Sequence, residues 1–293
     1  MRKIDLKIIK EAVKLLFVDA AENINDDLLE SLNKAFNDES SELGKSVLQQ
    51  IIDNDLLAKE KHVPMCQDTG VSVVFIEMGS EVWFVGDLEE AVNEGVKEAY
   101  VNHYLRKSMV KHPFNRVNTN DNTPAILHTK IVPGNKIKIS VAPKGAGSEN
   151  MSLVKMLTPS DGVEGVKNLV LKTIFESGGK PCPPLVVGIG IGGNLEKSAL
   201  LAKEAVMRDI SDESVDPINR GLEKEWLDEI NKLGVGPMGF GGTVTALAVK
   251  INTYPCHVAS YLSPLIFSVM PLGINQSFYR RLLWKFIHLL HKK

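Results

Sequence analysis

The stretch Pro64-Met65-Cys66-Gln67-Asp68-Thr69-Gly70 is followed directly by an apolar run, Val71-Ser72-Val73-Val74-Phe75-Ile76. Because a polar, helix-rich region precedes these seven residues, they are predicted to form a loop that leads into a strand. Gly70 permits a tight turn at the end of this loop. The adjacent thiol, amide and carboxylate of Cys66, Gln67 and Asp68 suit a metal site with hydrogen-bonding neighbours. A loop cysteine beside a capping aspartate would give the same pattern.

The composition excludes several classes of protein. The chain has 293 residues, 44% of them apolar and 24% charged, which is typical of a globular protein with one large domain or two. Its net charge is −2, and no basic stripe interleaves with aromatic residues before residue 260, so no nucleic-acid partner is expected. No apolar run reaches transmembrane length, so no membrane span is expected either. Three widely spaced cysteines do not form a disulfide framework, which favours a cytoplasmic location.

The hydrophobic pattern predicts an α+β fold, with an N-terminal helical region followed by small mixed β-sheets and packed helices. Helical spacing of apolar residues occurs in three segments before the Cys66 loop and in four after it. These helices are expected near residues 8–20, 26–36, 46–57, 87–105, 162–177, 195–208 and 217–232. Strands are expected near residues 71–78, 82–85, 125–132, 136–142 and 246–251, and the glycines 188–193 are expected between a strand and a helix. Turns are expected at Gly79-Ser80 and at Pro133-Gly134-Asn135.

Four further segments have compositions that suit a site. Cys182 lies between prolines, which hold it stiffly, as befits a ligand. The loop 144–150 could bind an anion through its backbone N–H groups. The amide-rich loop 112–124 is either a solvated surface loop or a functional one. The pattern Gly188-x-Gly190-x-x-Gly193 matches a dinucleotide fingerprint, but no strand precedes the acidic residue at the required spacing, so a turn near a substrate carboxylate fits better.

Five motifs occur in the order found in one enzyme family. The chain resembles the alpha subunit of the iron–sulfur class I hydro-lyases, namely class I fumarate hydratase and L(+)-tartrate dehydratase, over about residues 5–261. The motifs that carry the resemblance are Cys66-Gln67-Asp68-Thr69-Gly70, Gly145-Ala146-Gly147-Ser148, the glycines from 188 to 193, Gly236-Pro237-Met238-Gly239-Phe240-Gly241-Gly242, and Tyr254-Pro255-Cys256-His257-Val258-Ala259-Ser260.

The resemblance implies the hydration or dehydration of a small dicarboxylate, either fumarate to malate or tartrate to oxaloacetate. It also implies a [4Fe–4S] cluster that three cysteines hold, leaving one iron open as a Lewis acid. By motif, Cys66 and Cys182 are two of the ligands. A beta subunit is implied as the partner, because the family's second half is absent from this chain. The motifs do not distinguish fumarate from tartrate as the substrate.

The resemblance also assigns substrate-binding and catalytic residues. Arg106 resembles the arginine that clamps a substrate carboxylate, a task for which a bidentate guanidinium is suited. Gln67 and Gly147 are implied in substrate binding. Asp68, which supports the base that handles the C–H proton, and His257 are implied in catalysis.

The C-terminal segment departs from the family pattern. The third ligand would fall at Val269, and no cysteine follows Cys256. Residues 1–261 are therefore expected to form the alpha-subunit domain. Residues 262–293, which lack Asp and Glu, are expected to be a divergent tail. For this tail we favour a change of reading frame over a membrane-surface or partner helix. Cys256 is a structural or substitute thiol. The alternative to an active enzyme is a cluster-deficient relative that only binds ligands or is vestigial.

Overall fold

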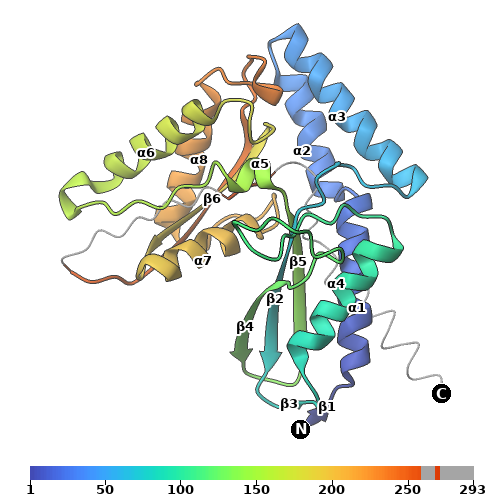
Figure 1. Ribbon diagram of the computed structural model, residues 1–293. Helices are drawn as coiled ribbons and strands as arrows, with labels where there is room; N and C mark the ends of the chain where they lie inside the picture. The colour runs from blue at the N-terminus through green and yellow to red at the C-terminus, as the bar shows by residue number, and fades with distance from the viewer. Residues whose placement is uncertain (259–267, 271–293) are drawn as a thin grey trace. The chain divides into compact units, whose positions relative to one another are not determined.

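The computed structural model describes residues 1–258 and 268–270, which fall into two compact units (Figure 1). The first unit contains residues 1–25 and 55–145. The second contains residues 26–54 and 146–258, together with 268–270. The α+β class predicted from the sequence is confirmed, and each unit has its own mixed sheet. No helix in the described residues is both long and apolar enough to cross a membrane.

The sheet of the first unit is built around the strand that follows the Cys66 loop. This strand, β2 (Val71–Gly79), pairs in parallel with β4 (Ile126–Val132) and antiparallel with β5 (Ile137–Lys144), giving the order β4-β2-β5. The next predicted strand is shorter than expected. It forms β3 (Val82–Trp83), which pairs in parallel with β1 (Arg2–Lys3) in a separate two-stranded sheet.

The turn between β4 and β5 closes over the end of β2 and does not form a hairpin. Gly79 donates its backbone N–H to the carbonyl of Lys136 at 2.8 Å, and Ser80 donates to the carbonyl of Val132 at 2.8 Å. A side chain at Gly79 would place Cβ 2.3 Å from the carbonyl oxygen of Gly134. β4 and β5 therefore lie on opposite edges of β2, and glycine is needed where the turn crosses.

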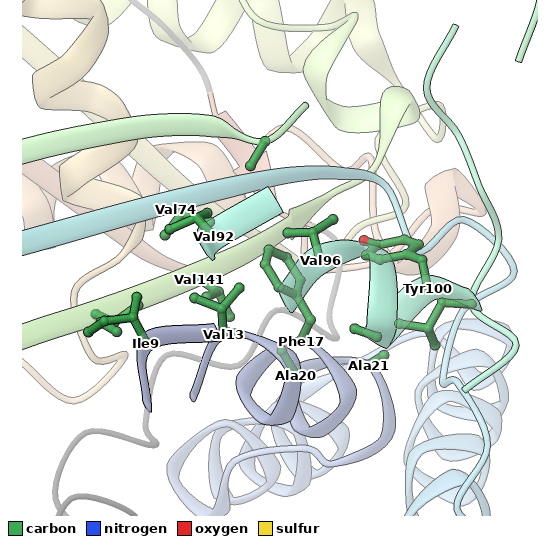
Figure 2. Close-up of a cluster of buried hydrophobic side chains, with 14 of the residues drawn as sticks. Ile9, Val13, Phe17, Ala20, Ala21, Val74, Val92, Val96, Tyr100 and Val141 are labelled. Atoms are coloured by element: carbon green, nitrogen blue, oxygen red, sulfur yellow. The ribbon is translucent and has the colours of Figure 1, made fainter. Parts of the chain in front are cut away.

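Two helices cover one face of this sheet (Figure 1). They are α1 (Leu6–Glu22), capped by Asp5, and α4 (Leu88–Asn102), capped by Asp87. Their apolar stripes meet the inward residues of β2 and β5 in a buried core (Figure 2). Phe17 and Tyr100 pack edge-to-face in this core, with ring centroids 5.9 Å apart. This core fixes α4 beside the start of β2, where the candidate site begins.

The second unit has its central strand at β6 (Leu185–Gly192). β7 (Ala246–Tyr254) pairs with β6 in parallel, and β8 (Ser268–Met270) pairs antiparallel on its other edge. The α-helices that lie wholly in this unit are α2 (Asp26–Asp38), α5 (Ala146–Glu149), α6 (Gly162–Ser177), α7 (Leu195–Val206) and α8 (Pro217–Asn231), and α3 (Glu42–Lys61) begins in it. The chain passes from the second unit to the first within α3, between Asn54 and Asp55. α3 is longer than its sequence pattern predicted.

The two faces of β6 carry different residues because different helices cover them. Leu185, Val187 and Ile189 pack into the core formed with α6 and α8. Gly188 and Gly190 lie against α7. A Cβ on Gly188 would be 2.1 Å from a methyl group of Val206, and a Cβ on Gly190 would be 2.1 Å from the carbonyl oxygen of Ser198. These two glycines of the fingerprint-like pattern therefore serve close strand–helix packing.

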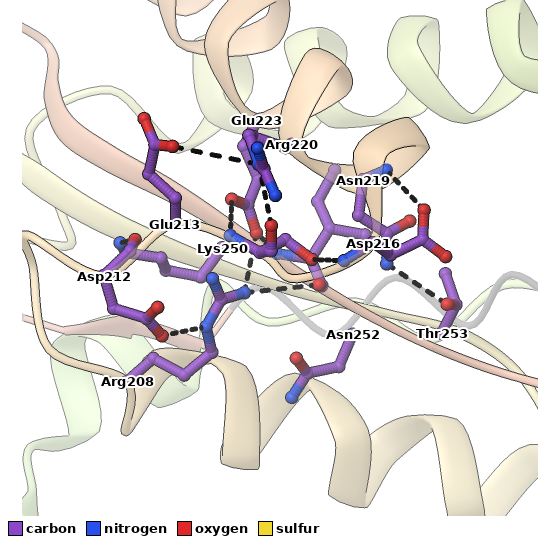
Figure 3. Close-up of polar contacts among 12 residues, drawn as sticks. Arg208, Asp212, Glu213, Asp216, Asn219, Arg220, Glu223, Lys250, Asn252 and Thr253 are labelled. Carbon is purple, nitrogen blue, oxygen red and sulfur yellow. Dashed lines mark hydrogen bonds and ion pairs between the residues drawn. The ribbon is translucent and has the colours of Figure 1, made fainter.

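A polar network joins the segment after α7 to α8 and β7 (Figure 3). Arg208 forms an ion pair with the buried carboxylate of Glu223 at 2.6 Å. Glu223 also accepts the backbone N–H groups of Ile251 and Ser214 at 2.7 Å and 3.2 Å. Lys250, which is buried, donates to the carbonyls of Ile210 and Asp212. The charges in this network are paired with each other or with the backbone, as buried charges require.

Candidate active site

The Cys66 loop is held in a defined shape by its own residues. Gly70 donates its N–H to Oδ1 of Asp68 at 3.1 Å, and Asp68 donates its N–H to Sγ of Cys66 at 3.4 Å. Gly70 has a φ of 71°, and a Cβ there would lie 2.4 Å from the carbonyl carbon of Lys144. Only glycine fits this position. In this loop Cys66 and Gln67 are exposed, and Asp68 is half-buried.

A buried tyrosine supports the loop from beneath. The hydroxyl of Tyr100 donates to the carbonyl of Thr69 at 2.5 Å and approaches the carbonyl of Gly70 at 3.4 Å. Burial raises the pKa of Tyr100, and the nearby charge of Asp68 acts in the same direction. The hydroxyl therefore stays protonated at neutral pH and remains a donor. The helical spacing of Tyr100 identified it only as a core residue.

The loop that carries Arg106 is tied to the Cys66 loop. Thr69 donates its hydroxyl to the carbonyl of Arg106 at 3.0 Å, and Ser108 donates its hydroxyl to Oδ1 of Asp68 at 3.3 Å. Leu105 is buried beside them, while Arg106 is exposed. Within residues 1–258, the guanidinium makes no hydrogen bond or ion pair. The structure thus leaves this guanidinium exposed, on a segment whose backbone is bonded to the Cys66 loop.

The amide-rich loop after Arg106 supports the site. Asn118 donates its side-chain N–H to the carbonyl of Lys107 at 2.9 Å. Asn122, which is fully buried, bonds to Ser108, Gly70 and Ser72. Sequence reasoning left this loop undecided. The feature of the sequence that could have marked this loop as a support is its run of asparagines immediately before a strand.

The Cys182 loop is tightly packed in the second unit. Cys182 is half-buried, has a φ of 62°, and donates its N–H to the carbonyl of Gly179 at 3.0 Å. The glycine-rich segment 236–242 packs against it. Met238 donates its N–H to the carbonyl of Pro183 at 2.8 Å, and a Cβ on Gly239 would lie 2.5 Å from Cα of Gly179. The glycines in both segments allow backbone to meet backbone.

The two remaining predicted site residues also lie in the second unit. Gly147 is exposed in the short helix α5, and a Cβ there would lie 3.0 Å from the carbonyl oxygen of Lys180. Gly147 therefore borders the segment that carries Cys182. His257 is exposed beyond the end of β7. Its segment borders the end of β6, because Gly193 donates its N–H to the carbonyl of Pro255 at 3.2 Å.

The predicted site residues fall into two sets. Cys66, Gln67, Asp68 and Arg106 come together in the first unit, and Gly147, Cys182 and His257 belong to the second. None of the three cysteines, all of which lie in the described part of the chain, forms a disulfide. In the part of the chain that the structure describes, no three His, Cys, Asp or Glu side chains form a group that could hold a metal ion. The convergence of Cys66 and Cys182 on one cluster remains a prediction.

A separate depression beside the start of α4 does not suit an anionic ligand. Its volume is about 340 Å³, and most of the charges that line it are negative. The lining residues are Asp87, Glu89, Glu90, Asn93, Glu94, Lys97, Asp121 and Thr123. Its carboxylates would repel a dicarboxylate. The exposed guanidinium of Arg106 is electrostatically better suited to an anionic ligand than this depression is.

Comparison with known proteins places the chain in a family. The family model described as "Fumarate hydratase (Fumerase)" matches residues 10–267, which is most of the chain. The chain belongs to the fumarate hydratase family. This membership identifies it as a hydro-lyase, and all seven predicted site residues lie inside the matched span.

Relatives in this family carry a consistent name. A protein of Methanocaldococcus jannaschii, provisionally named L(+)-tartrate dehydratase subunit alpha, is 46% identical over 273 residues, covering 91% of this chain and 92% of that protein. L(+)-tartrate dehydratase subunit alpha of Escherichia coli strain K12 is 32% identical over 236 residues, covering 79% of this chain and 78% of that protein. The subunit of that name from Shigella boydii matches at the same identity and coverage.

Proposed function

We propose that the chain is the alpha subunit of a hydro-lyase that adds water to, or removes it from, a small dicarboxylate. The candidate reactions are fumarate to malate and tartrate to oxaloacetate. The observation that carries the proposal is the family match over residues 10–267, which includes every predicted site residue. The relatives' names as alpha subunits support a beta subunit as partner. Free cysteines and the lack of a spanning helix in the described residues are compatible with a cytoplasmic enzyme.

We further propose that Cys66 and Cys182 are ligands of a [4Fe–4S] cluster. The donors fit such a cluster in kind, because thiolates are its usual ligands and neither cysteine is in a disulfide. When bound, the cluster would supply a Lewis-acidic iron for the departing hydroxyl group. The family motifs in this chain supply only two cysteine ligands, whereas the family's cluster is held by three. The position that corresponds to the third ligand is Val269, whose backbone pairs with Val187 in β8.

Arg106 is proposed to bind one substrate carboxylate. Its guanidinium is exposed and has no partner among the described residues, while its backbone is fixed by Thr69. A fixed backbone with a free fork-shaped cation is suited to bidentate binding of a carboxylate. The exposed amide of Gln67 would bind the substrate beside it.

Asp68 and His257 are proposed to serve proton transfer. Oδ1 of Asp68 accepts from the backbone of Gly70 and from Ser108, so the carboxylate is held in one orientation. An oriented carboxylate can align the base that takes the C–H proton. His257 is exposed beyond β7, and Gly147 would offer its backbone to the substrate.

The C-terminal segment bears on whether the chain is active as written. We propose that residues 1–261 form the alpha-subunit domain and that residues 262–293 are a divergent tail. Cys256 is exposed and precedes His257, so it is the substitute ligand to test. The cluster-deficient alternative is favoured by one observation, the lack of any cysteine after Cys256.

The test is activity of the chain assembled anaerobically with its beta subunit. The complex is assayed with fumarate, malate and L(+)-tartrate, and hydration or dehydration of at least one is expected. Arg106→Ala should raise KM about thirtyfold, because it removes a charged hydrogen-bonded pair of about 2 kcal/mol. Arg116→Ala, an exposed arginine ten positions on, is the control and should leave KM unchanged. Activity that is unaffected by Arg106→Ala would contradict the assigned role.

A further inference from the structure

Asn122 lies at the centre of the polar contacts beneath the candidate site. Its side chain is fully buried, and its φ of 63° is in the left-handed region, which asparagine tolerates. Oδ1 accepts the backbone N–H of Ser108 at 2.7 Å. Nδ2 donates to the carbonyl of Gly70 at 3.1 Å and to the hydroxyl of Ser72 at 3.0 Å.

These contacts require both ends of an amide. The N–H of Ser108 can only donate and the carbonyl of Gly70 can only accept, so the orientation of the Asn122 side chain is fixed by its partners. An aspartate there would keep the acceptor for Ser108 and lose the donor for Gly70. An alanine would remove the acceptor of the Ser108 N–H, and it would leave the Gly70 carbonyl only its 3.4 Å contact with the Tyr100 hydroxyl.

The two partners belong to the two loops that carry the first unit's site residues. Gly70 ends the loop of Cys66, Gln67 and Asp68. Ser108 closes the loop of Arg106. Two hydroxyl groups also link these loops, through single hydrogen bonds of 3.0 Å and 3.3 Å. Asn122 differs from them in that its side chain bonds to the backbone of both loops.

We propose that Asn122 is a positioning residue that sets the distance between the carboxylate clamp at Arg106 and the loop of Cys66 and Asp68. This inference rests on the proposed function of the site. A dicarboxylate bound to Arg106 must present its reacting carbon to the neighbouring loop. A shift of about 1 Å between the loops can cost about a hundredfold in rate.

The first test measures two sites in the isolated full chain, namely hydrogen exchange of the Ser108 amide and the 13C chemical shift of the Gly70 carbonyl, which are the groups that Asn122 contacts. Asn122→Asp should leave the Ser108 amide protected and shift the Gly70 carbonyl resonance, because only the donor is lost. Asn122→Gly, which keeps the left-handed φ, should shift that resonance and speed exchange at Ser108 about tenfold, since its N–H loses one hydrogen bond. Asn120→Asp is the matched control, because Asn120 is exposed and also has a left-handed φ. It should change neither site.

The second test measures ligand discrimination in the assembled complex. Succinate and butyrate are compared as competing ligands, and the wild-type complex should prefer the dicarboxylate. Asn122→Asp should reduce this preference at least tenfold without weakening butyrate binding, a pattern that general loss of stability would not produce. In an Arg106→Ala background, Asn122→Asp should have no further effect on the preference.

The outcomes separate the inference from the proposed function. Suppose that the first test gives the expected changes but the complex neither hydrates nor dehydrates fumarate, malate or L(+)-tartrate. The positioning role then stands and the proposed function fails. If the complex is active and Asn122→Gly leaves the Ser108 amide protected and the Gly70 carbonyl resonance unshifted, the inference is overturned. If Asn122→Asp fails to fold, Asn122→Gly is used for both tests. An unchanged preference of that variant for succinate over butyrate also overturns the inference.

Discussion

The carboxylate of Glu39 accepts hydrogen bonds from Thr243, which lies 204 positions further along the chain. The backbone N–H of Thr243 reaches both carboxylate oxygens, at 2.9 Å and 3.0 Å, and its hydroxyl reaches Oε1 at 3.1 Å. Val244 and Ser41 each donate a backbone N–H at 2.8 Å. Glu39 is only 2% exposed, so this buried acid connects the turn between α2 and α3 to the end of the glycine-rich segment 236–242.

Glu39→Gln should destabilise the protein at pH 7. The new amide group would point an N–H at backbone N–H groups, leaving donors unpaired in a buried place. The expected loss is about 2 kcal/mol in the free energy of unfolding, measured with urea. Glu30→Gln on the exposed side of α2 is the control and should change stability by less than about 0.5 kcal/mol.

The stabilisation from Glu39 should depend on pH. Burial raises the pKa of Glu39, but the hydrogen bonds that it accepts outweigh burial, and the pKa lies below the ordinary 4.5. A depressed pKa gives stability that is complete above the unfolded value and is lost as the pH falls through the folded value. The difference in unfolding free energy between wild type and Glu39→Gln should therefore shrink below about pH 4. A difference that stays constant down to pH 3 would contradict this account.

Asp19→Asn should stabilise the first unit at neutral pH. Burial raises the pKa of Asp19 from 3.8 to about 6, against the hydrogen bond from Asn23. An acid whose pKa is higher in the folded state than in the unfolded state destabilises the protein when the pH is above the folded-state pKa. It has no such effect when the pH is below the unfolded-state pKa. After allowance for partial exposure, the expected gain at pH 7 is about 1 kcal/mol, falling to zero near pH 4. Asp53→Asn, whose exposed carboxylate accepts a similar bond from Gln49, is the control.

Two glycine substitutions should have opposite effects on stability. In Gly190→Ala the added methyl group would lie 2.1 Å from the Ser198 carbonyl oxygen, so α7 must move away from β6, at a cost of about 2 kcal/mol. In Gly221→Ala, within α8, the methyl group meets no atom within 4 Å. That change should stabilise by about 0.5–1 kcal/mol, because alanine favours a helix. Thermal unfolding of both variants decides whether Gly190 serves packing.

Local patterns predicted the elements of the fold, and long-range contacts decided their arrangement. The helices around Asp87 and after residue 195 follow from caps and helical spacing. The turn at Pro133-Gly134-Asn135 looks like a hairpin, yet β4 and β5 flank β2 and do not pair with each other. Strand order depends on which edges of β2 are free, and no short stretch of sequence encodes that.

The same distinction holds for the candidate site. The Cys66–Gly70 loop was predictable, because a glycine before an apolar run is a local signal. The supports beneath it were not. Tyr100 lies on an apolar helix face, and its bond to Thr69 spans 31 positions. Asn122 lies 52 positions from Gly70, and Glu39 has no local feature that marks it as buried.

The central claim is that Cys66 and Cys182 bind an iron–sulfur cluster, and anaerobic reconstitution with iron and sulfide tests it most directly. Iron content and cluster absorbance are measured for the wild type and for Cys66→Ser, Cys182→Ser and Cys256→Ser. We expect a labile cluster in the wild type and in Cys256→Ser, because two family ligands leave it weakly held. We expect none in Cys66→Ser or Cys182→Ser. Cluster formation that survives both of these substitutions would contradict the account.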